Sequence, residues 1–271
     1  MIEFRNVDFW IGEQQILNDV SFAVPRAQTK VILGPSGSGK STILRLLMGL
    51  WKPDAGAILV DGEDITRVTP LRLRQIRQRM GIVFQQGALF DSMTVGENIG
   101  YTLLEDGHIE EEEIEGAVHS YLSLVGLDTG LVDRMPDELS GGMQRRVAIA
   151  RALASRDPDI LLYDEPTTGL DPQSAERITD LIVRLRDTMG KTSVVVTHDI
   201  PDAFKVANRI TVLDNGRVVF EGTPAELAAA DTPFIGEFLA PFRKAVAAAS
   251  RHVDARGHRA GGTELNLGGT Q

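Results

Sequence analysis

The segment Gly34–Ser41, GPSGSGKS, constrains the fold of this chain more than any other stretch of its sequence. It matches the pattern G-x-x-x-x-G-K-[ST], in which small residues let backbone N–H groups turn inward and surround an anion. The short, largely apolar run Lys30–Leu33 precedes it, and a helical pattern over Ser41–Leu50 follows it. A strand, a glycine-rich loop and a helix in this order predict a phosphate-binding unit.

The chemistry of this loop predicts nucleotide binding. Lys40 is expected to reach the outer phosphates, and the Ser41 hydroxyl is expected to ligate Mg²⁺. The loop alone leaves open what the nucleotide is used for. The predicted nucleotide-binding residues here are Gly34, Pro35, Ser36, Gly37, Ser38, Gly39, Lys40, Ser41 and Thr42.

Two acidic residues end a second apolar run. Ile160–Tyr163 is followed directly by Asp164 and Glu165. Parallel sheets bind ligands at the carboxyl ends of their strands, so both carboxylates are expected beside the phosphates. Asp164 is placed to hold Mg²⁺, directly or through water, and Glu165 is placed to polarise the attacking water. The pair therefore predicts nucleotide hydrolysis.

A second helix start has the features of an anion site. Leu139–Gln144 precedes the apolar helical run Val147–Leu153. Ser140 is a favourable N-cap, and Gly141 and Gly142 leave the backbone open. Because the chain has one phosphate loop, a second anion site without its own nucleotide indicates a split site. Two copies facing head to tail would complete each other's pockets, which predicts a two-fold dimer holding two nucleotides.

Hydrophobic patterns outline the remaining elements. Strands are predicted over 3–9, 16–24, 57–60, 80–84, 160–163 and 193–197, and a hairpin over 210–220. Between the predicted strands 80–84 and 160–163, over about residues 94–155, strand patterns are absent. Ile114, Val118, Tyr121, Leu122 and Val125 instead recur on one helical face. We interpret this region as an inserted helical subdomain.

The C-terminal part of the chain has a different character. Helices are expected near 224–230 and 233–247, and the residues after about Ser250 are rich in Gly, Ala and Arg. The predicted boundaries are one domain over 1–240, followed by a helix end and flexible tail over 241–271. Wrapping of this tail around a neighbouring subunit is the alternative to disorder.

Composition limits the classes of function. The net charge is −10, which is unfavourable for non-specific nucleic-acid binding. The chain has no cysteine, and no stretch approaches the roughly 20 apolar residues of a membrane span. The N-terminus lacks the charged-then-apolar pattern of a signal peptide. We therefore expect a cytosolic chain whose role at a membrane, if it has one, comes through a partner.

Three further motifs make a family resemblance plain. Gln85 follows Phe84, the segment Gly169–Asp171 follows the carboxylate pair, and His198 follows the predicted strand 193–197. With the phosphate loop and Leu139–Gln144, these lie in the order of an ABC-transporter nucleotide-binding subunit. The chain resembles this family over about residues 2–240. The implied fold is α/β, a P-loop NTPase core with a mainly parallel sheet, an N-terminal antiparallel β subdomain and an inserted α-helical subdomain.

The resemblance also implies roles. Ser140, Gly141 and Gly142 would touch the γ-phosphate of the partner's ATP, and Asp171 would link the two active sites. Gln85 would reach Mg²⁺ and water while its loop contacts a permease, and His198 would hold the γ-phosphate. The expected reaction is ATP hydrolysis coupled to transport, with ATP and Mg²⁺ bound. The implied catalytic residues are Glu165, His198, Gln85 and Lys40, and the metal ligands are Ser41, Gln85 and Asp164.

One position departs from the family pattern. An aromatic residue often stacks on adenine just before the first turn glycine, and here Ile11 stands before Gly12. Stacking of a base on an aromatic ring contributes roughly 1–3 kcal/mol, so Ile11 would contribute less. Trp10 is an alternative stacking residue, whereas Phe9 is expected to face the core. The sequence leaves the adenine contact open.

The residues in and around three of these motifs indicate the sub-family. Phe84–Ser92, Ser140–Arg146 and Asp164–Pro172 are similar to the ATPases of MCE-associated, Mla-type lipid transporters. This resemblance implies a homodimer on the cytoplasmic face of the bacterial inner membrane, a multi-span permease and, through it, an MCE-type periplasmic protein. Phospholipid traffic between the inner and outer membranes is the implied task. The apolar stretch Gly87–Phe90 suits a groove for a permease helix, with core packing as the alternative.

Other functions are kept as alternatives. A polar-solute importer, for example one for amino acids, would carry the same hydrolytic motifs. Soluble ABC-type ATPases that act on ribosomes or DNA usually have two cassettes or a long coiled-coil insert, and this chain has neither. A P-loop kinase is disfavoured by the segment Leu139–Gln144.

Overall fold

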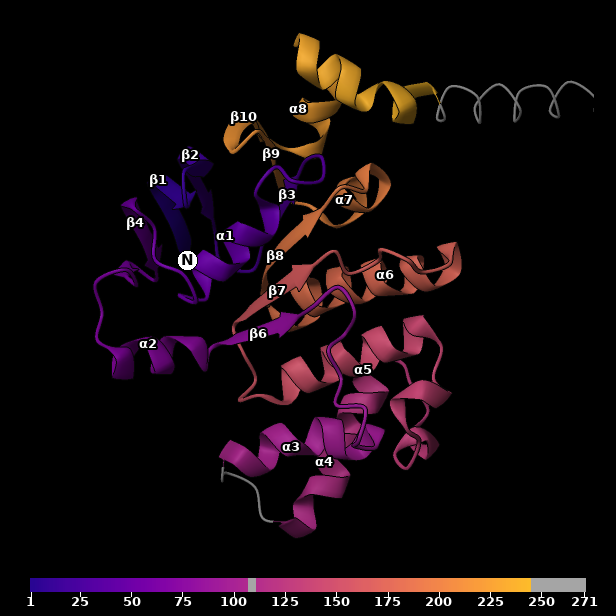
Figure 1. Cartoon of the computed structure of the whole chain (residues 1–271). Coiled ribbons are helices and arrows are strands. Elements are labelled where there is room, and N and C mark those ends of the chain that lie inside the picture. The colour runs from indigo at the N-terminus through magenta and orange to yellow at the C-terminus, as the bar shows by residue number, and fades with distance from the viewer. Residues whose placement is uncertain (107–110, 245–271) are drawn as a thin grey trace, which may run out of the picture. The chain divides into compact units, whose positions relative to one another are not determined.

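The computed structural model describes residues 1–106 and 111–244 (Figure 1). The chain divides into one unit over Met1–Leu227 and a second over Ala228–Gln271. The elements in chain order are β1 (Ile2–Ile11), β2 (Gln14–Val24), β3 (Thr29–Leu33), α1 (Lys40–Leu47), β4 (Ala55–Val60), β5 (Glu63–Asp64), α2 (Pro70–Arg77), β6 (Met80–Val83), α3 (Val95–Asp106), α4 (Glu111–Leu124), η1 (Thr129–Leu131), η2 (Pro136–Glu138), α5 (Gly141–Ala154), β7 (Ile160–Asp164), α6 (Pro172–Met189), β8 (Thr192–Thr197), α7 (Ile200–Val206), β9 (Arg209–Asp214), β10 (Arg217–Gly222) and α8 (Pro224–Ala229).

The strands of the first unit form two sheets. The smaller sheet has the order β2-β1-β4-β5 and is antiparallel throughout. The larger sheet has the order β10-β9-β3-β8-β7-β6, and its pairs are parallel except for the β9–β10 hairpin. Central strands β3, β7 and β8 are almost fully buried, as expected for parallel strands covered on both faces. The expected α/β architecture is confirmed.

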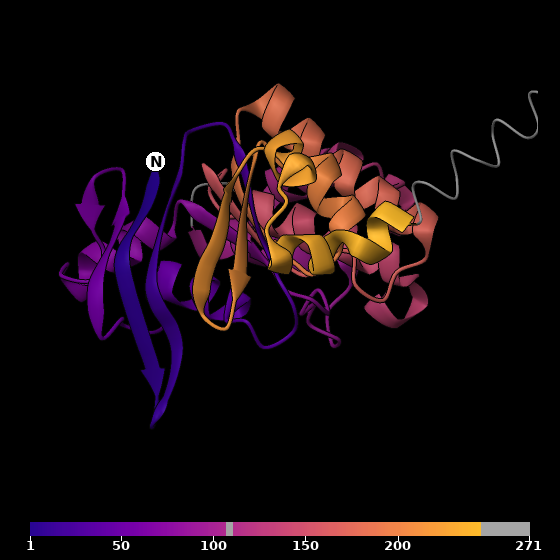
Figure 2. The same ribbon diagram turned by 90° about the horizontal axis from the view of Figure 1, so that it is seen from above.

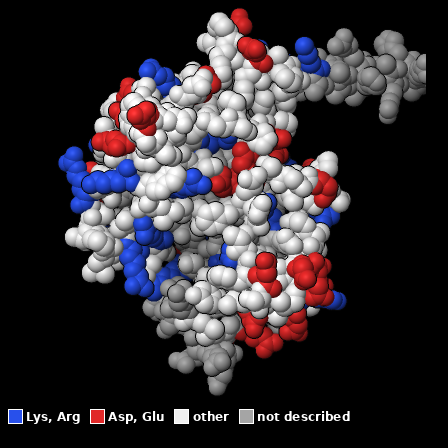
Figure 3. Space-filling model, in the orientation of Figure 1, with Lys and Arg blue, Asp and Glu red and all other residues white. Residues whose placement is uncertain are grey.

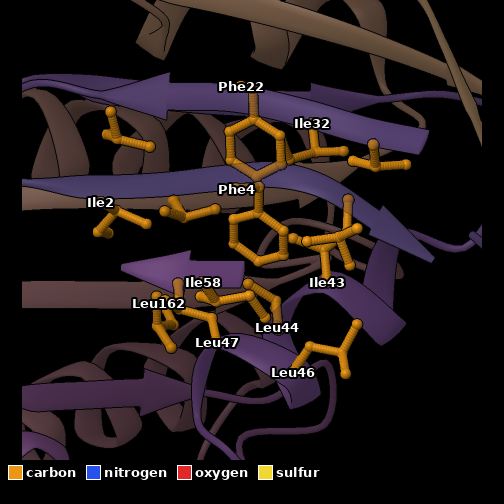
Figure 4. Packing of buried hydrophobic residues seen from close by; sticks show 14 of the residues in the cluster. Ile2, Phe4, Phe22, Ile32, Ile43, Leu44, Leu46, Leu47, Ile58 and Leu162 are labelled. Atoms are coloured by element: carbon orange, nitrogen blue, oxygen red, sulfur yellow. The ribbon is translucent and has the colours of Figure 1, made fainter. Parts of the chain in front are cut away.

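Helix α1 packs in the core between the two sheets (Figure 4). Phe4 of β1 and Phe22 of β2 stack with ring centroids 4.5 Å apart. Ile43 and Leu44 of α1 belong to the same buried cluster as these rings, and so does Leu162 of β7. Burial of apolar surface on both sides of α1 therefore fixes the helix that follows the glycine-rich loop.

The helical subdomain lies between β6 and β7 in the chain, as predicted. Helices α3, α4 and α5 lie together in Figure 1, and η1 contacts α4. The side chains of Val118 and Leu122 on α4 are buried, and so is that of Val125 directly after the helix, which confirms the predicted apolar face. No helix among residues 1–106 and 111–244 is long and apolar enough to cross a bilayer.

Charged side chains separate on the face shown in Figure 3. Lys and Arg gather on the left of this view around α2, whose sequence includes Arg72, Arg74 and Arg77. Acidic residues gather on the lower right of the same view. The acidic excess therefore does not cover this face uniformly.

A buried lysine joins three strands. Lys30 of β3 is 1% exposed, and its ammonium pairs with the Glu221 carboxylate of β10. Glu221 also accepts a hydrogen bond from Thr211 of β9 and lies 3.5 Å from Arg209 Nε. On its other side, Lys30 Nζ lies 5.7 Å from the centroid of the Phe22 ring. Burial lowers the pKa of Lys30, and Glu221 opposes that shift.

The Lys30–Glu221 pair lies where the two sheets approach each other. Figure 2 shows the β9–β10 hairpin beside the β1–β2 strands, and β10 contacts β2. Because a buried ammonium needs a counter-charge, Glu221 stabilises this junction. The pair thus helps to hold the antiparallel sheet beside the strand that leads into the glycine-rich loop.

The second unit is described as far as residue 244. Its helix runs from 233 to the last described residue, in agreement with the predicted helix start. Phe234 and Phe238 stack with centroids 5.8 Å apart, and Arg243 donates to the carbonyl oxygens of Ala228 and Ala230. The predicted tail over 241–271 falls almost entirely outside the described residues.

Replacing Glu221 should destabilise the protein. In Glu221→Ala the Lys30 ammonium would keep its burial and lose its counter-charge, and we expect a loss of about 3 kcal/mol in the free energy of unfolding. Chemical denaturation at neutral pH measures this. Glu3→Ala is the control, because Glu3 pairs with the exposed Arg5 and should change stability by less than about 0.5 kcal/mol. Equal effects of both variants would contradict the role given to Lys30.

Candidate functional site

The register of the parallel strands gathers the predicted site residues at one edge of the larger sheet. Leu33 of β3 pairs with Thr197 of β8, and Asp164 of β7 pairs with Val196 of β8. Val83 of β6 pairs with Tyr163, one residue earlier in β7. The segments that leave these strands therefore start side by side, and they carry the glycine-rich loop, Gln85, Glu165 and His198.

Helix α1 has an open N-terminus. Gly39 precedes it with φ of 101°, a left-handed conformation that disfavours side chains, and no side chain caps the helix. A side chain caps α2, α5 and α6, through Thr69, Ser140 and Asp171 respectively. The first N–H groups of α1 are thus left for an anion, which the positive end of the helix favours.

Lys40 is held inside the loop that it follows. Its Nζ donates to the carbonyl oxygens of Gly34 and Pro35, both at 2.9 Å, and lies 3.7 Å from Glu165 Oε1. The side chain is buried, and this burial lowers the pKa of Lys40, while the Glu165 and Asp164 carboxylates oppose the shift. The ammonium is therefore already at the centre of the loop, where phosphate oxygens can replace the carbonyls.

The Glu165 carboxylate is held by several donors. Its Oε2 lies 2.9 Å from His198 Nδ1, and it accepts from Thr168 Oγ1 at 3.0 Å and from Thr197 Oγ1 at 3.3 Å. The backbone of Glu165 has φ of 48°, a conformation that a non-glycine residue seldom adopts. Sequence reasoning found Glu165 and His198 and missed both threonines, whose hydroxyls fix the orientation of the carboxylate.

Asp164 and Ser41 form a pair of oxygen donors. Ser41 Oγ donates to Asp164 Oδ1 at 3.0 Å, which joins the start of α1 to the end of β7. Hard oxygen donors suit Mg²⁺, which usually keeps water and phosphate oxygens in its shell. Among the described residues no group of three or more His, Cys, Asp or Glu could hold a metal by itself. The donor set therefore fits a metal that arrives with a nucleotide.

A cleft of about 390 Å³ brings most of these residues together. Three groups of predicted residues contribute to its lining. They are the glycine-rich loop with Lys40 and Ser41, Gln85 after β6, and the pair Glu165 and His198. Eight predicted site residues are absent from its lining: Gly34, Pro35, Ser38, Ser140, Gly141, Gly142, Asp164 and Asp171. The full lining is Ile11, Ile16, Ser36, Gly37, Gly39, Lys40, Ser41, Thr42, Arg45, Trp51, Gln85, Glu165 and His198.

The predicted residues Ser140–Gly142 and Asp171 lie at the starts of two other helices, α5 and α6. Ser140 Oγ accepts from Met143 N at 3.3 Å, which confirms the predicted N-cap of α5. Asp171 caps α6 through Ser174 N at 3.0 Å, a role that sequence reasoning missed. A Cβ on Gly142 would come within 2.7 Å of the Ser174 side chain, so glycine permits close packing of the two helix starts.

A second cleft, of about 550 Å³, lies next to the first. The two share His198, and the second is lined by Thr168–Leu170 and by the start of α7 at Asp199–Asp202. Its walls come from the segment between Glu165 and α6, from α6 itself and from α7, and they contain no part of the glycine-rich loop. Of these two clefts, the smaller one is therefore the one that contains the phosphate loop.

Comparison with known proteins decides the family. The model of the family described as ABC transporter matches residues 17–168, which include the loop and the carboxylate pair. The chain belongs to the ABC transporter family. It is thus an ATP-binding ATPase of the cassette type, and the resemblance drawn from its motifs is confirmed.

Individual relatives agree with this. The intermembrane phospholipid transport system ATP-binding protein MlaF of Escherichia coli strain K12 is 40% identical over 88% of either chain. The Fe(3+) ions import ATP-binding protein FbpC of the same strain is 41% identical over 83% of this chain and 63% of its own. The dimeric structure of an ATP-binding cassette in a post-hydrolysis state with ADP and Pi superposes with a TM-score of 0.75. That cassette is 36% identical and covers 83% of this chain and 99% of its own.

Part of the lining of the cassette's cleft is apolar. This part includes the half-exposed Ile11 together with Ile16 and Trp51. Trp51 stacks on Phe9 with centroids 5.3 Å apart, and the Arg45 guanidinium lies 4.8 Å from the Trp51 centroid. Phe9 is buried, as expected. Trp10 is exposed outside the cleft lining, so Trp51, which sequence reasoning missed, is the aromatic residue of this cleft.

The segment after Gln85 borders a separate groove. This groove, about 540 Å³, is lined by Ala88 and Leu89 together with Pro136 and Gln144 from the helical subdomain. Phe90 is 44% exposed, and its ring makes an edge contact with Tyr101 at 5.5 Å. The apolar stretch Gly87–Phe90 is thus only partly used in core packing, and part of it faces an open groove.

Asp164→Asn should stabilise the nucleotide-free protein. Burial raises the pKa of Asp164, with Ser41 opposing and Glu165 adding to the shift, so the folded state disfavours its carboxylate. We expect a gain of about 1 kcal/mol at neutral pH. The gain should vanish as the pH falls below the ordinary value of 3.8, because both states are then protonated. Thermal unfolding without nucleotide measures this, with Asp187→Asn on the surface as control. Destabilisation at neutral pH would contradict the assigned burial cost.

Proposed function

We propose that two copies of this chain close on two ATP molecules and thereby drive a membrane permease. The proposal is supported by the separation of two anion-binding features. The open N-terminus of α1 lies in the cleft, whereas Ser140–Gly142 at the start of α5 lies outside its lining. In a head-to-tail pair, the α5 start of one copy faces the loop of the other, and each ATP is enclosed by both.

Six residues in and beside the cleft have tasks in this cycle. Lys40 leaves the carbonyls of Gly34 and Pro35 and binds the outer phosphates. Glu165 accepts a proton from the attacking water, with His198 holding the carboxylate and the γ-phosphate. Ser41, Asp164 and Gln85 would hold Mg²⁺, which when bound would supply positive charge to neutralise the phosphates.

Closure and reopening follow from where the γ-phosphate lies. It joins the loop of one copy to Ser140, Gly141 and Gly142 of the other, so the closed state exists while ATP is intact. Asp171 lies at the start of α6, beside the α5 start, and links the two sites. Hydrolysis removes the shared phosphate and lets the copies separate, so ATP acts as the ligand of a two-state switch.

The cargo we propose is phospholipid, moved between the bacterial inner and outer membranes. Support comes from the 40% identity to MlaF over 88% of either chain and from the open groove to which Ala88 and Leu89 contribute apolar surface. The groove suits a helix of a multi-span permease. The chain would then lie at the cytoplasmic face of the inner membrane, and an MCE-type periplasmic protein would join through the permease.

A polar-solute importer is the second candidate. It is favoured by the 41% identity to FbpC, whose name describes import of Fe(3+) ions. The hydrolytic residues are common to both candidates, so the ATPase itself does not distinguish them. The membrane partner and its cargo do.

Glu165→Gln should trap the closed pair. Removing the general base should lower the hydrolysis rate by about 10²–10⁴-fold while ATP still binds. In gel filtration with ATP and Mg²⁺ the variant should elute as a dimer, and with ADP as a monomer. Lys40→Ala is the contrasting variant, since calorimetry should detect a loss of ATP affinity. Wild-type turnover by Glu165→Gln would refute the assignment.

Mixing two inactive variants tests whether the sites are shared. Lys40→Ala damages the loop, and Ser140→Arg damages the start of α5, so a mixed pair keeps one intact site. Some hydrolysis should return on mixing, up to about half of a two-site dimer if the sites act independently. The shared-site proposal would be contradicted if mixing the two variants restored no hydrolysis and an isolated wild-type monomer hydrolysed ATP at the full rate.

Disturbing the groove should release the permease without harming the ATPase. Leu89→Glu places a charge among the groove residues, so less membrane protein should co-purify from detergent-solubilised membranes while ATP binding stays near wild type. Leu71→Glu is the matched control, because Leu71 is 70% exposed on α2. Equal recovery of a multi-span protein with both variants would argue against the groove.

The lipid carried by the wild-type complex identifies the cargo class. Mass spectrometry of the purified complex should detect phospholipid retained by the partner proteins at about stoichiometric amounts. A co-purifying periplasmic solute-binding protein without enriched lipid would favour the importer. Recovery of ribosomal components in place of a membrane protein would contradict a transport function.

A further inference from the structure

Arg145 lies at a junction that none of the roles above includes. It belongs to the second turn of α5, and its side chain reaches across to the parallel sheet. Its Nη1 donates to the carbonyl oxygen of Glu165 at 3.2 Å, and its Nη2 donates to the carbonyl oxygen of Gln85. One guanidinium thus contacts the backbone of two residues of the cleft from the helix that starts at Ser140.

The location of this guanidinium is energetically costly. Arg145 is 5% exposed, and burial lowers the pKa of its guanidinium. Among the described residues, no carboxylate lies within ion-pair distance of it, and its described hydrogen bonds go to carbonyl oxygens. A buried cation without a counter-charge usually destabilises a fold, so packing alone gives a poor reason for an arginine here.

The two carbonyls belong to neighbouring strand ends. Gln85 follows β6 and Glu165 follows β7, and these strands are paired in parallel. The left-handed backbone of Glu165, with φ of 48°, occurs at the same residue whose carbonyl accepts from Arg145. Arg145 therefore couples the helical subdomain to the main chain of the proposed general base and of a proposed metal ligand.

Helix α5 also holds the continuation of the Gln85 segment. Arg151, two turns further on, donates from Nη2 to the Gly87 carbonyl at 3.0 Å, and its guanidinium lies 5.4 Å from the Phe90 centroid. The buried Asn98 of α3 bonds both the N–H and the carbonyl of Phe90, at 2.8 and 3.1 Å. Residues after Gln85 are thus attached to the helical subdomain, and Arg145 is the contact that also reaches the core.

We propose that Arg145 is a positioning residue that transmits movement of the α5 start to Gln85 and Glu165. The inference rests on the proposed function, in which the α5 start binds the partner's ATP. When the partner's phosphate engages Ser140–Gly142, α5 shifts, and the guanidinium carries both carbonyls with it. The Glu165 carboxylate then reaches its working position only in the closed pair, which limits hydrolysis to the coupled state.

Two variants of adjacent arginines test this role. Arg145→Gln in the full chain should lower kcat about 10–100-fold, since a misplacement of about 1 Å at the reacting groups has effects of this size. ATP affinity, measured by calorimetry, should stay near wild type. Arg146→Gln is the matched control, because Arg146 points to the Gly126 carbonyl at 2.6 Å and should keep wild-type kcat.

A double-mutant cycle separates positioning from simple loss of structure. If Arg145 acts through the Gln85 segment, Arg145→Gln combined with Gln85→Ala should hydrolyse ATP about as fast as Gln85→Ala alone. A structural role would instead give additive losses together with weakened ATP binding. Arg145→Lys, which keeps the charge and can reach one carbonyl, should recover part of kcat, and it replaces Arg145→Gln in the cycle if that variant does not fold.

The outcomes separate this inference from the function on which it rests. Wild-type kcat in Arg145→Gln, or additive effects in the cycle, would overturn the role of Arg145 while leaving the ATPase intact. Absence of ATP hydrolysis and of ATP-dependent dimerisation in the wild-type chain, purified with its membrane partner, would instead contradict the proposed function. A lowered kcat with retained ATP affinity and a non-additive cycle is the result that supports the inference.

Discussion

The parallel pairing of β3, β8, β7 and β6 is the constraint on which the rest of the structure depends. Parallel pairing forces the carboxyl ends of these strands to one edge, whatever lies between them in the chain. Segments about 130 residues apart in sequence, around Lys40 and Glu165, therefore meet within 3.7 Å. The buried apolar runs that make the strands thus also determine which polar residues share a cleft.

Helix starts supply the second layer of organisation. Most of the described helix starts near the sheet edge have their own cap, Ser140 on α5 and Asp171 on α6 among them. The start of α1 has none, and a side chain on Gly39 would collide with Leu17. A capped start is stable by itself, whereas an uncapped start gains most from a bound anion. This difference favours the α1 start as the main phosphate site and α5 as a secondary one.

Local sequence patterns predicted most of the strands and helices and the motif residues. The strand runs, the apolar face of α4 and the Ser140 cap depend on neighbours in sequence, and the structure agrees with them. The patterns named no helix over α6, although Ile178, Leu181, Ile182 and Leu185 recur at helical spacing and are buried there. That signal was present in the sequence.

The residues missed at the site depend on contacts between distant segments. Trp51 faces the cleft because it stacks on Phe9, more than 40 residues earlier. Thr197 and Arg145 matter because parallel pairing and subdomain packing bring them to Glu165. Threonine, tryptophan and arginine are ordinary outside such a context, so no spacing rule identifies them. Only the arrangement of the strands does.

The site combines several unfavourable features. Burial lowers the pKa of Lys40 and of Arg145 and raises the pKa of Asp164, so each shift marks a cost of keeping the charged form. Glu165 adds a backbone conformation that non-glycine residues seldom adopt. Anionic phosphates and a divalent cation would offset these costs, and a ligand that binds the folded state stabilises it. The groups whose charges and backbone are unfavourable in the fold alone are thus those that nucleotide and metal would stabilise.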